Sequence, residues 1–222
     1  MQLLKLFSSI MKPTRLAVHL IAIYTLLSLT NFAGAAPEAK RILFLGDSLT
    51  AGYGIDPQQA YPALIAKKLE ESGRDDYTVS PAGLSGETSA GGLRRASWVM
   101  QKPVDILVLA LGANDGLRGI KLTDTQKNLQ GIIDFAREKY PEIKIVLAGM
   151  QMPPNLGEAY TSEFRALYPS LAERNQIPLI PFLLEGVAGD PSLNISDGIH
   201  PNPAGHKILA ETVWTHLEPL LD

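Results

Sequence analysis

The stretch Val104-Asp-Ile-Leu-Val-Leu-Ala-Leu111 decides the fold class, because seven of its eight residues are apolar. A strand with one solvated face alternates apolar and polar residues, whereas a strand buried on both faces is apolar throughout, as in the centre of a parallel sheet. Gly112-Ala-Asn-Asp115 follows at once, so small and polar residues begin where the apolar run ends. The stretch therefore predicts a central parallel strand with a polar turn at its carboxyl end.

Predicted strands and predicted helices alternate on either side of this stretch. Four shorter apolar runs predict strands at residues 41–45, 77–80, 144–149 and 177–181. Helical spacing of apolar residues predicts helices at 61–71, 89–101, 123–140, 158–176 and 203–217, the fourth of them interrupted near Pro169. Such alternation is typical of a parallel sheet with helices on both faces, so we predict one α/β domain without repeats or linkers.

The composition excludes several kinds of chemistry. The 222 residues are 45% hydrophobic and 19% charged, with a formal net charge of −3, which fits a chain that buries a core and lacks the basic excess of nucleic-acid-binding proteins. The absence of cysteine excludes disulfides, zinc–thiolate sites, a cysteine nucleophile and a lipidated N-terminal cysteine. With four histidines in the whole sequence, histidine chemistry has few candidates.

Residues 1–35 have the pattern of a secretory signal. They contain three basic residues and no acidic one, then a nearly continuous apolar stretch over 16–30, then small residues ahead of Ala36-Pro37. A membrane anchor is the alternative, but the apolar stretch is shorter than the roughly 18–20 residues that a spanning helix needs. We therefore expect a cleaved signal peptide at 1–35, a mature domain at 36–222 and a periplasmic or secreted bacterial location.

Removal of this signal would change the charge of the protein. The three basic residues would be lost, and the remaining 17 basic and 23 acidic side chains would give a net charge of −6. The mature domain would keep three histidines, His200, His206 and His216. Met11-Lys12-Pro13 would make a more ordinary start of such a signal than Met1, which suggests the hypothesis that residues 1–10 are an extension from an upstream start site.

Four polar clusters follow predicted strands of the sheet. They are Gly46-Asp-Ser-Leu49, Ser85-Gly-Glu-Thr88, Gly112-Ala-Asn-Asp115 and Asp197-Gly-Ile-His200. In open α/β sheets the carboxyl ends of the strands share one edge, and ligands bind at that edge. We therefore predict a functional site built from the four clusters together.

The spacing of Asp197 and His200 suggests a catalytic pair. A carboxylate three residues before a histidine can bind one ring nitrogen, fix the tautomer and stabilise the imidazolium, which leaves the other nitrogen to act as a base. A serine hydroxyl is weak until a base takes its proton, and Ser48 on the turn after the first strand is the candidate nucleophile. Each motif alone also has a structural interpretation, because Ser48 could cap a helix and Asp-x-x-His could begin one.

Other strand-to-helix motifs do not match this turn. The G-x-S-x-G elbow of many hydrolases would need glycine at position 50, where the chain has Thr50. The glycine-rich stretch 46–54 lacks the Lys-Ser/Thr pair of a phosphate-binding loop and the G-x-G-x-x-G spacing of a dinucleotide site.

Taken in order, the four clusters resemble the four sequence blocks of the SGNH (GDSL) hydrolases. The resemblance spans nearly the whole of 36–222 and is carried by Gly46-Asp-Ser-Leu49, Gly86, Gly112-x-Asn-Asp115 and Asp197-x-x-His200. The stretches 114–119 and 197–202 look most like the bacterial periplasmic branch of thioesterases, lysophospholipases and arylesterases. The resemblance implies a three-layer α/β/α fold with a flavodoxin-like, five-stranded parallel sheet.

The resemblance also implies a set of roles for particular residues. Ser48 would be the nucleophile, His200 the general base and Asp197 its orienting carboxylate. The oxyanion hole would be formed by the backbone N–H groups of Ser48 and Gly86 and by the side-chain amide of Asn114. Preorganised uncharged donors of this kind stabilise the negative charge of a tetrahedral intermediate, so the implied roles are chemically coherent.

The implied function is hydrolysis of carboxylic esters or thioesters through an acyl-Ser48 intermediate, with no metal or cofactor. We expect a monomer that acts on small acyl substrates, binds no nucleic acid and keeps no stable membrane anchor after cleavage. A carbohydrate O-deacetylase with the same catalytic set is the first alternative. A non-catalytic lipid or glycan binder is another, and a third is a metal-dependent phosphoesterase, because carboxylates and imidazole bind divalent ions. The metal ligands would be Asp47, Asp115, Asp197 and His200.

Residues near these clusters carry simpler expectations. We expect Asp47 to brace the turn and Asp115 to hold its loop, and we expect His206 and His216 to be solvated. Arg118 could meet an anionic substrate group or form a surface salt bridge. Five residues on the loop after the fourth predicted strand would either form an apolar wall for an acyl chain or simply pack in the core. They are Met150, Met152, Pro153, Pro154 and Leu156.

Overall fold

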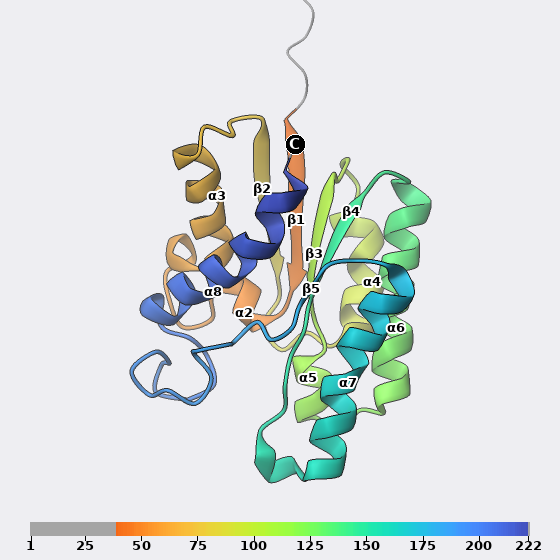
Figure 1. Ribbon diagram of the computed structural model, residues 1–222, viewed down its shortest axis with the longest axis vertical. Helices are drawn as coiled ribbons and strands as arrows, with labels where there is room; N and C mark the ends of the chain where they lie inside the picture. Colours follow the sequence, from red (N-terminus) through yellow and green to blue (C-terminus); the bar gives the residue numbers. More distant parts are fainter. Residues whose placement is uncertain (1–38, 222) are drawn as a thin grey trace, which may run out of the picture. The chain divides into compact units, whose positions relative to one another are not determined.

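Five parallel strands form one sheet in the order β2-β1-β3-β4-β5 (Figure 1). The computed structural model describes residues 39–221, so the predicted signal peptide lies outside the described residues. The strands are β1 (Lys40–Gly46), β2 (Tyr77–Gly83), β3 (Ile106–Ala110), β4 (Lys144–Ala148) and β5 (Leu179–Ile180). This strand order is that of a flavodoxin-like sheet, which confirms the predicted fold class.

Helices cover both faces of the sheet. The α-helices are α2 (Ser48–Ala51), α3 (Tyr61–Glu71), α4 (Ser89–Val99), α5 (Ala113–Leu117), α6 (Leu122–Lys139), α7 (Glu158–Asn175) and α8 (Pro203–Leu217). Short 3-10 helices lie at Pro57–Gln59, Pro154–Leu156 and Glu218–Leu220. In Figure 1, α3 and α8 lie on one side of the sheet, and α4, α6 and α7 lie on the other. The result is the predicted three-layer arrangement.

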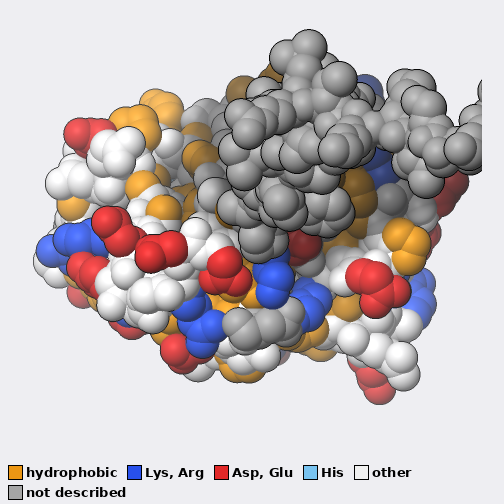
Figure 2. Space-filling model, turned by 90° about the horizontal axis from the view of Figure 1, so that it is seen from above, with side chains coloured by type: hydrophobic (Ala, Val, Ile, Leu, Met, Phe, Trp, Pro, Cys, Tyr) orange, Lys and Arg blue, Asp and Glu red, His pale blue; other side chains and the backbone are white. Residues whose placement is uncertain are grey.

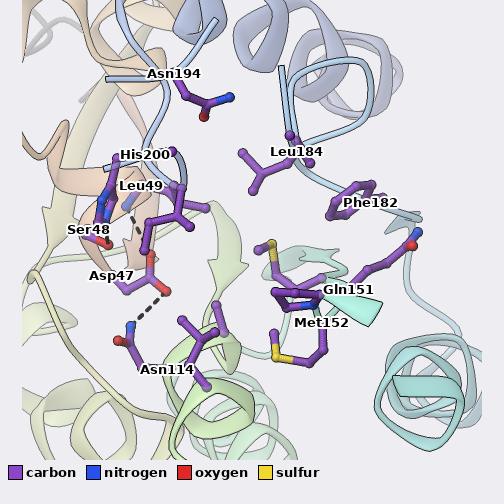
Figure 3. A pocket seen from close by; sticks show the side chains of 18 of the residues that line it. Asp47, Ser48, Leu49, Asn114, Gln151, Met152, Phe182, Leu184, Asn194 and His200 are labelled. Atoms are coloured by element: carbon purple, nitrogen blue, oxygen red, sulfur yellow. Dashed lines mark hydrogen bonds between the residues drawn. The ribbon is translucent and has the colours of Figure 1, made fainter. Parts of the chain in front are cut away.

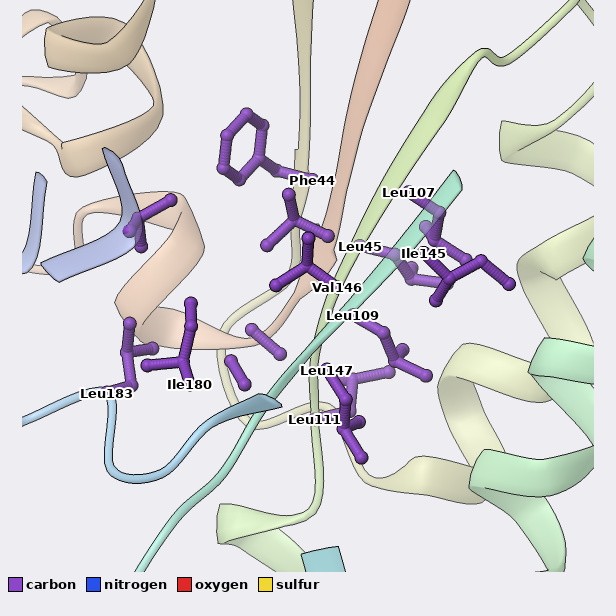
Figure 4. Packing of buried hydrophobic residues seen from close by; sticks show 14 of the residues in the cluster. Phe44, Leu45, Leu107, Leu109, Leu111, Ile145, Val146, Leu147, Ile180 and Leu183 are labelled. Carbon is purple, nitrogen blue, oxygen red and sulfur yellow. The ribbon is translucent and has the colours of Figure 1, made fainter. Parts of the chain in front are cut away.

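The core follows from the apolar strand that decides the fold. All five residues of β3 are buried, and β3 is hydrogen-bonded to β1 on one side and β4 on the other. Side chains of neighbouring positions point to opposite faces, as Figure 4 shows for Ile145 and Val146. Each fully buried aliphatic side chain of this kind contributes about 1.5–3 kcal/mol relative to an exposed one. The sheet therefore gives the polar turns at its edge a rigid base.

Two proline positions modify the predicted elements. β5 has two residues instead of the expected five, because Pro178 and Pro181 flank it and proline has no N–H for the ladder. The predicted interruption of α7 near Pro169 is wrong, since the helix continues through it. Pro169 and Arg165 are both exposed, so the carbonyl that loses its helical partner faces water.

The outer surface of the described residues is mixed in charge. Acidic and basic side chains are interspersed on the face that Figure 2 shows. Among residues 39–221, no helix has both the length and the apolar character needed to cross a membrane.

Candidate active site

Ser48 is held on a tight turn between β1 and the short helix α2. It is the first residue of α2, and Asp47 caps this helix by accepting a hydrogen bond from Leu49 N at 3.0 Å. The turn needs glycine at position 46, because the Thr50 side chain occupies the space that a Cβ there would need. The Ser48 side chain therefore leaves the sheet at the carboxyl end of β1 in a fixed position.

His200 joins Ser48 to Asp197. Its Nε2 lies 2.9 Å from Ser48 Oγ, and its Nδ1 lies 2.6 Å from Asp197 Oδ2. The Asp197 contact places the ring proton on Nδ1, so Nε2 is free to accept the Ser48 proton. The Tyr53 ring, with its centroid 4.6 Å from that of His200, packs against the imidazole. The structure thus brings the three predicted catalytic residues together, and Tyr53 is a contact that the sequence analysis missed.

The Asp197 carboxylate is kept in its charged form. Partial burial acts to raise its pKa, but hydrogen bonds from His200 and from the backbone N–H groups of Ile199 and His200 lower the pKa below its ordinary value. The two backbone bonds are 3.0 and 3.1 Å long. Asp197 can therefore stabilise a positive charge on His200 when the ring takes a proton.

The loop between β5 and α8 is anchored close to the catalytic pair. Ile195 N donates to His200 O at 2.8 Å, and Asn194 forms a bridge with Pro201. The Asn202 side chain then caps α8 by accepting from Ala204 N and Gly205 N. These contacts fix His200 although the strand before the loop is very short.

Asn114 is tied to the nucleophile turn. It is the second residue of α5, and its Nδ2 donates to Asp47 Oδ2 at 3.3 Å. Asp47 is 2% exposed, and this burial raises its pKa to about 6 against the opposing hydrogen bond from Leu49 and the charge of His200. Asp47 therefore braces the turn, as expected from the sequence, and in addition it holds Asn114.

Gly86 lies on the turn that follows β2. Its φ of 76° is in the left-handed region, which favours glycine, and Glu87 N donates to Leu84 O at 3.0 Å to close the turn. Arg118 donates from Nη2 to Gly86 O at 2.9 Å. This bond to the backbone is neither the contact with an anionic substrate group nor the surface salt bridge that was expected for Arg118. Gly86 is not among the described residues that line the cavity, whereas Ser48, Asn114 and His200 are.

Asp115 has a structural position behind the site. It is fully buried and accepts hydrogen bonds from Ser89 N, Ser89 Oγ and Thr125 Oγ1, which join α5 to α4 and α6. Its carboxylate therefore holds the loop, and its hydrogen bonds go to Ser89 and Thr125. Within residues 39–221 no three His, Asp or Glu side chains form a group that could hold a metal ion, so the four proposed metal ligands do not come together.

A cavity of about 500 Å³ opens beside Ser48. Most of its wall is apolar, and the larger apolar side chains on it are Leu49, Leu117, Met150, Met152, Phe182, Leu184 and Ile199. Figure 3 shows Met152, Phe182 and Leu184 across the cavity from Ser48, His200 and Asn114. Four of the five residues predicted for an apolar wall line it, and Leu156, which is 40% exposed, does not.

The expectation for His206 is wrong. His206 is 1% exposed, its Nδ1 accepts a hydrogen bond from Tyr61 N at 3.2 Å, and its ring stacks on that of Tyr61. Burial, with a smaller effect of His200, lowers the pKa of His206 to about 4. His216, in the last turn of α8, is half-buried, with Nδ1 2.9 Å from Thr212 O. Neither histidine is simply solvated.

Comparison with known families identifies a match across most of the chain. Residues 44–208 match the GDSL-like lipase/acylhydrolase family. The matched range begins in β1 and ends in α8, so it contains Ser48, Gly86, Asn114, Asp197 and His200.

Three characterised relatives are similar over most of their length. Esterase TesA of Pseudomonas aeruginosa is 42% identical over 82% of this chain and 90% of the relative. An arylesterase of Vibrio mimicus is 37% identical over 86% of this chain and 96% of the relative. Thioesterase 1/protease 1/lysophospholipase L1 of Escherichia coli is 36% identical over 90% of this chain and 92% of the relative.

Solved structures agree with these sequence matches. The crystal structure of TesA is 40% identical, with a TM-score of 0.78 over 82% of this chain and all of the other. AlinE4, an esterase of the SGNH-hydrolase family, is 37% identical, with a TM-score of 0.68 over 85% of this chain and all of the other.

Proposed function

The chain belongs to the GDSL-like lipase/acylhydrolase family, and from this membership we propose that it is a serine hydrolase of carboxylic esters and thioesters that acts through an acyl-Ser48 intermediate. The observation that carries the proposal is the continuous line of hydrogen bonds from Ser48 Oγ through the His200 ring to Asp197. The names of the relatives, esterase, arylesterase and thioesterase/lysophospholipase, support the same chemistry.

The first half of the reaction forms the acyl-enzyme. Ser48 Oγ attacks the substrate carbonyl carbon while His200 Nε2 takes the hydroxyl proton, and Asp197 stabilises the resulting imidazolium. The carbonyl oxygen becomes negatively charged, and the Ser48 N–H, the Gly86 N–H and the Asn114 amide are the proposed donors to it. Collapse of the intermediate breaks the bond to the alcohol or thiol, which leaves with the proton from His200.

The second half releases the acid. A water molecule takes the place of the leaving group, His200 Nε2 accepts its proton, and the hydroxide oxygen attacks the acyl carbon of the ester on Ser48. The same donors stabilise the second oxyanion. Breaking the bond to Ser48 Oγ returns the proton from His200 to the serine and frees the carboxylic acid.

The wall of the cavity supports an acyl chain as the group bound beside Ser48. Most of its surface is apolar, and a hydrocarbon chain gains about 0.8 kcal/mol for each buried CH₂ group. A sugar ring would instead need polar side chains for its hydroxyl groups. The apolar wall therefore favours the ester and thioester proposal over the carbohydrate O-deacetylase.

We also propose that the enzyme acts outside the cytoplasm without a lasting membrane anchor. The proposal rests on the signal-like sequence of residues 1–35. Expression of the full chain in a bacterium, fractionation and N-terminal sequencing of the product test it. A mature product that begins near Ala36 in the periplasm or medium is expected, and an uncleaved cytoplasmic product contradicts it.

Replacement of the nucleophile tests the proposed reaction. Ser48→Ala should abolish hydrolysis of short-chain p-nitrophenyl esters and of acyl-CoA, and it should also abolish labelling by an organophosphorus reagent. Ser97→Ala, which changes an exposed serine on α4, is the matched control and should keep both activities. Turnover by the Ser48→Ala enzyme at the normal rate would overturn the proposal.

A further inference from the structure

The Arg95 side chain connects the ends of two strands. Its Nη2 donates to Gly46 O at 3.2 Å and to Ala82 O at 2.5 Å. The hydrogen-bonded ladder between β1 and β2 ends at Gly46, so the guanidinium lies where the pairing of the sheet stops. Ser48 follows two residues later. Arg95 therefore fixes the strand end from which the nucleophile turn begins.

The same guanidinium is paired with Glu87. Arg95 Nε donates to Glu87 Oε2 at 2.5 Å, and Nη2 forms an ion pair with the same oxygen. The Arg95 and Glu87 side chains are 18% and 3% exposed, so the pair is largely shielded from water. Buried charges of this kind depend strongly on their partners, because the loss of one leaves the other uncompensated.

This ion pair lies next to the turn that presents Gly86. The turn begins at Leu84, whose N–H donates to Gly46 O at 3.0 Å, and it ends at Glu87, whose N–H donates to Leu84 O. Gly86 is its third residue, and the positive φ there is what a type II turn requires. Both ends of the turn are thus tied to the end of β1, one by the Leu84 N–H and the other through Arg95.

We propose that the Arg95–Glu87 pair positions the Gly86 N–H relative to Ser48, and so sets the geometry of the oxyanion hole. This inference rests on the proposed function, because it matters for catalysis only if Gly86 is an oxyanion donor. Neither Arg95 nor Glu87 is among the described residues that line the cavity. They act through the backbone and are positioning residues.

The planar guanidinium is essential to this role. It holds two carbonyl groups and one carboxylate at the same time, because Nη2 donates to both carbonyl oxygens while Nε donates to the carboxylate. A lysine ammonium is a single charged point on a flexible stem and cannot reproduce this planar arrangement. Arg95→Lys therefore keeps the charge and removes the geometry, which makes it the informative variant.

Steady-state kinetics on a short p-nitrophenyl ester test the proposal. The rate is expressed per active site, counted by complete labelling with an organophosphorus reagent. Arg95→Lys should lower kcat by about 10- to 100-fold with little change in KM, because a displaced donor weakens transition-state binding. The pH at which activity falls on the acid side should not move, since His200 and Asp197 are untouched. Arg94→Lys, on the exposed side of α4, is the matched control and should behave like the wild type.

A purely structural role predicts a different result. In that case Arg95→Lys would lower the melting temperature and the fraction of active sites, while kcat per active site stayed unchanged, and this outcome overturns the proposal. A rise in KM alone also overturns it. If Arg95→Lys does not fold, Glu87→Gln decides by the same criteria, with a smaller expected loss of kcat. Ser48→Ala measured in parallel separates the two claims, because its activity tests the nucleophile and not the Arg95–Glu87 pair.

Discussion

The buried carboxylate of Asp47 accepts a hydrogen bond from the side-chain amide of Asn114 across 3.3 Å. Its other oxygen accepts from Leu49 N and caps the helix that begins with Ser48. One carboxylate therefore fixes both the nucleophile turn and the Asn114 amide, at the expense of burying a negative charge. Burial of this charge lowers the stability of the fold, whereas the two hydrogen bonds that it accepts serve catalysis, so Asp47→Asn should change activity and stability in opposite directions.

Asp47→Asn should lower activity. An asparagine oxygen can replace the carboxylate at Leu49 N, but its NH₂ group would then face the NH₂ group of Asn114, and two donors do not bind each other. The Asn114 amide must turn away, and loss of one oxyanion donor typically lowers kcat about 100-fold or more. Kinetics on p-nitrophenyl esters measure this, with Asp75→Asn at an exposed position as the control. Wild-type kcat in Asp47→Asn would show that Asp47 does not position Asn114.

The free energy of unfolding of Asp47→Asn, relative to that of the wild type, should be larger at neutral pH than at acid pH. The folded pKa of Asp47 is about 6 and its ordinary value is 3.8, so the folded protein binds the proton more tightly than the unfolded chain. Stability therefore falls as pH rises through this window, and the full penalty, about 3 kcal/mol, is present above it. Urea unfolding should show Asp47→Asn gaining stability over the wild type as pH rises from about 4 to about 7. An equal difference at both pH values contradicts this account.

His206 should have the opposite effect on the pH dependence of stability. Its pKa in the folded protein is about 4, below its ordinary value of 6.5. Between pH 4 and pH 6.5 the histidine is therefore protonated in the unfolded chain and neutral in the folded protein. Stability is lost as pH falls through this window, by about 3 kcal/mol at its end. His206→Asn keeps an acceptor for Tyr61 N and does not titrate. Its unfolding free energy should therefore decrease less between about pH 7 and pH 4 than that of the wild type; a parallel decrease would be inconsistent with the buried neutral ring.

Asn114→Ala should lower kcat more than it changes KM. The amide is proposed to bind the oxyanion, which exists only in the transition state and the tetrahedral intermediate. Its loss should therefore lower kcat about 100-fold and leave substrate affinity nearly unchanged. The comparison needs kcat and KM for one ester in both enzymes. If KM rises while kcat is retained, Asn114 binds the ground state instead.

Ala188→Phe should shorten the acyl chain that the enzyme prefers. Ala188 lines the cavity, so a phenyl ring there removes part of its volume of about 500 Å³. Each CH₂ group that the cavity accepts should raise kcat/KM by about fourfold, from roughly 0.8 kcal/mol of burial. A series of p-nitrophenyl esters should show this rise ending at a shorter chain in Ala188→Phe, with acetate hydrolysis retained. Ala166→Phe, at an exposed position on α7, is the control, and an unchanged chain-length profile in Ala188→Phe would place the acyl group elsewhere.

The sheet and the Asp197–His200 pair could be predicted because their signals are local, whereas the link to Ser48 came from the order of the four sequence blocks. The apolar run that contains Ile106–Ala110 has the length and composition of a strand buried on both faces, and Asp197 and His200 identify each other by their spacing. The burial of His206 also had a signal that the prediction did not use. On α8 it lies three, four and seven residues before Leu209, Ala210 and Val213, all of which are buried, so it shares their face of the helix.

The remaining features depend on contacts between distant segments. Phe182 and Leu184 reach the cavity from an irregular loop, where no periodicity tells an apolar residue which way to point. Arg95 is a basic residue on a predicted helix, a residue type that is usually exposed, and only the end of the sheet supplies the two carbonyl groups that it binds. The predicted break at Pro169 was wrong for a similar reason, since tertiary packing of Tyr168 and Leu171 holds α7 together around it.

The three-residue spacing of Asp197 and His200 also affects how this enzyme can evolve. The carboxylate binds backbone N–H groups of its own turn, so the acid–base pair is complete within one short segment. Of the two hydrogen bonds that link the triad, the one from His200 to Ser48 spans 152 positions of sequence and depends on the whole fold. Asn194 and Ile195 fix His200, so the part of the loop ahead of Asn194 is where length and sequence can change with the least effect on the Asp197–His200 pair, and it is there that the shape of the substrate pocket is free to vary.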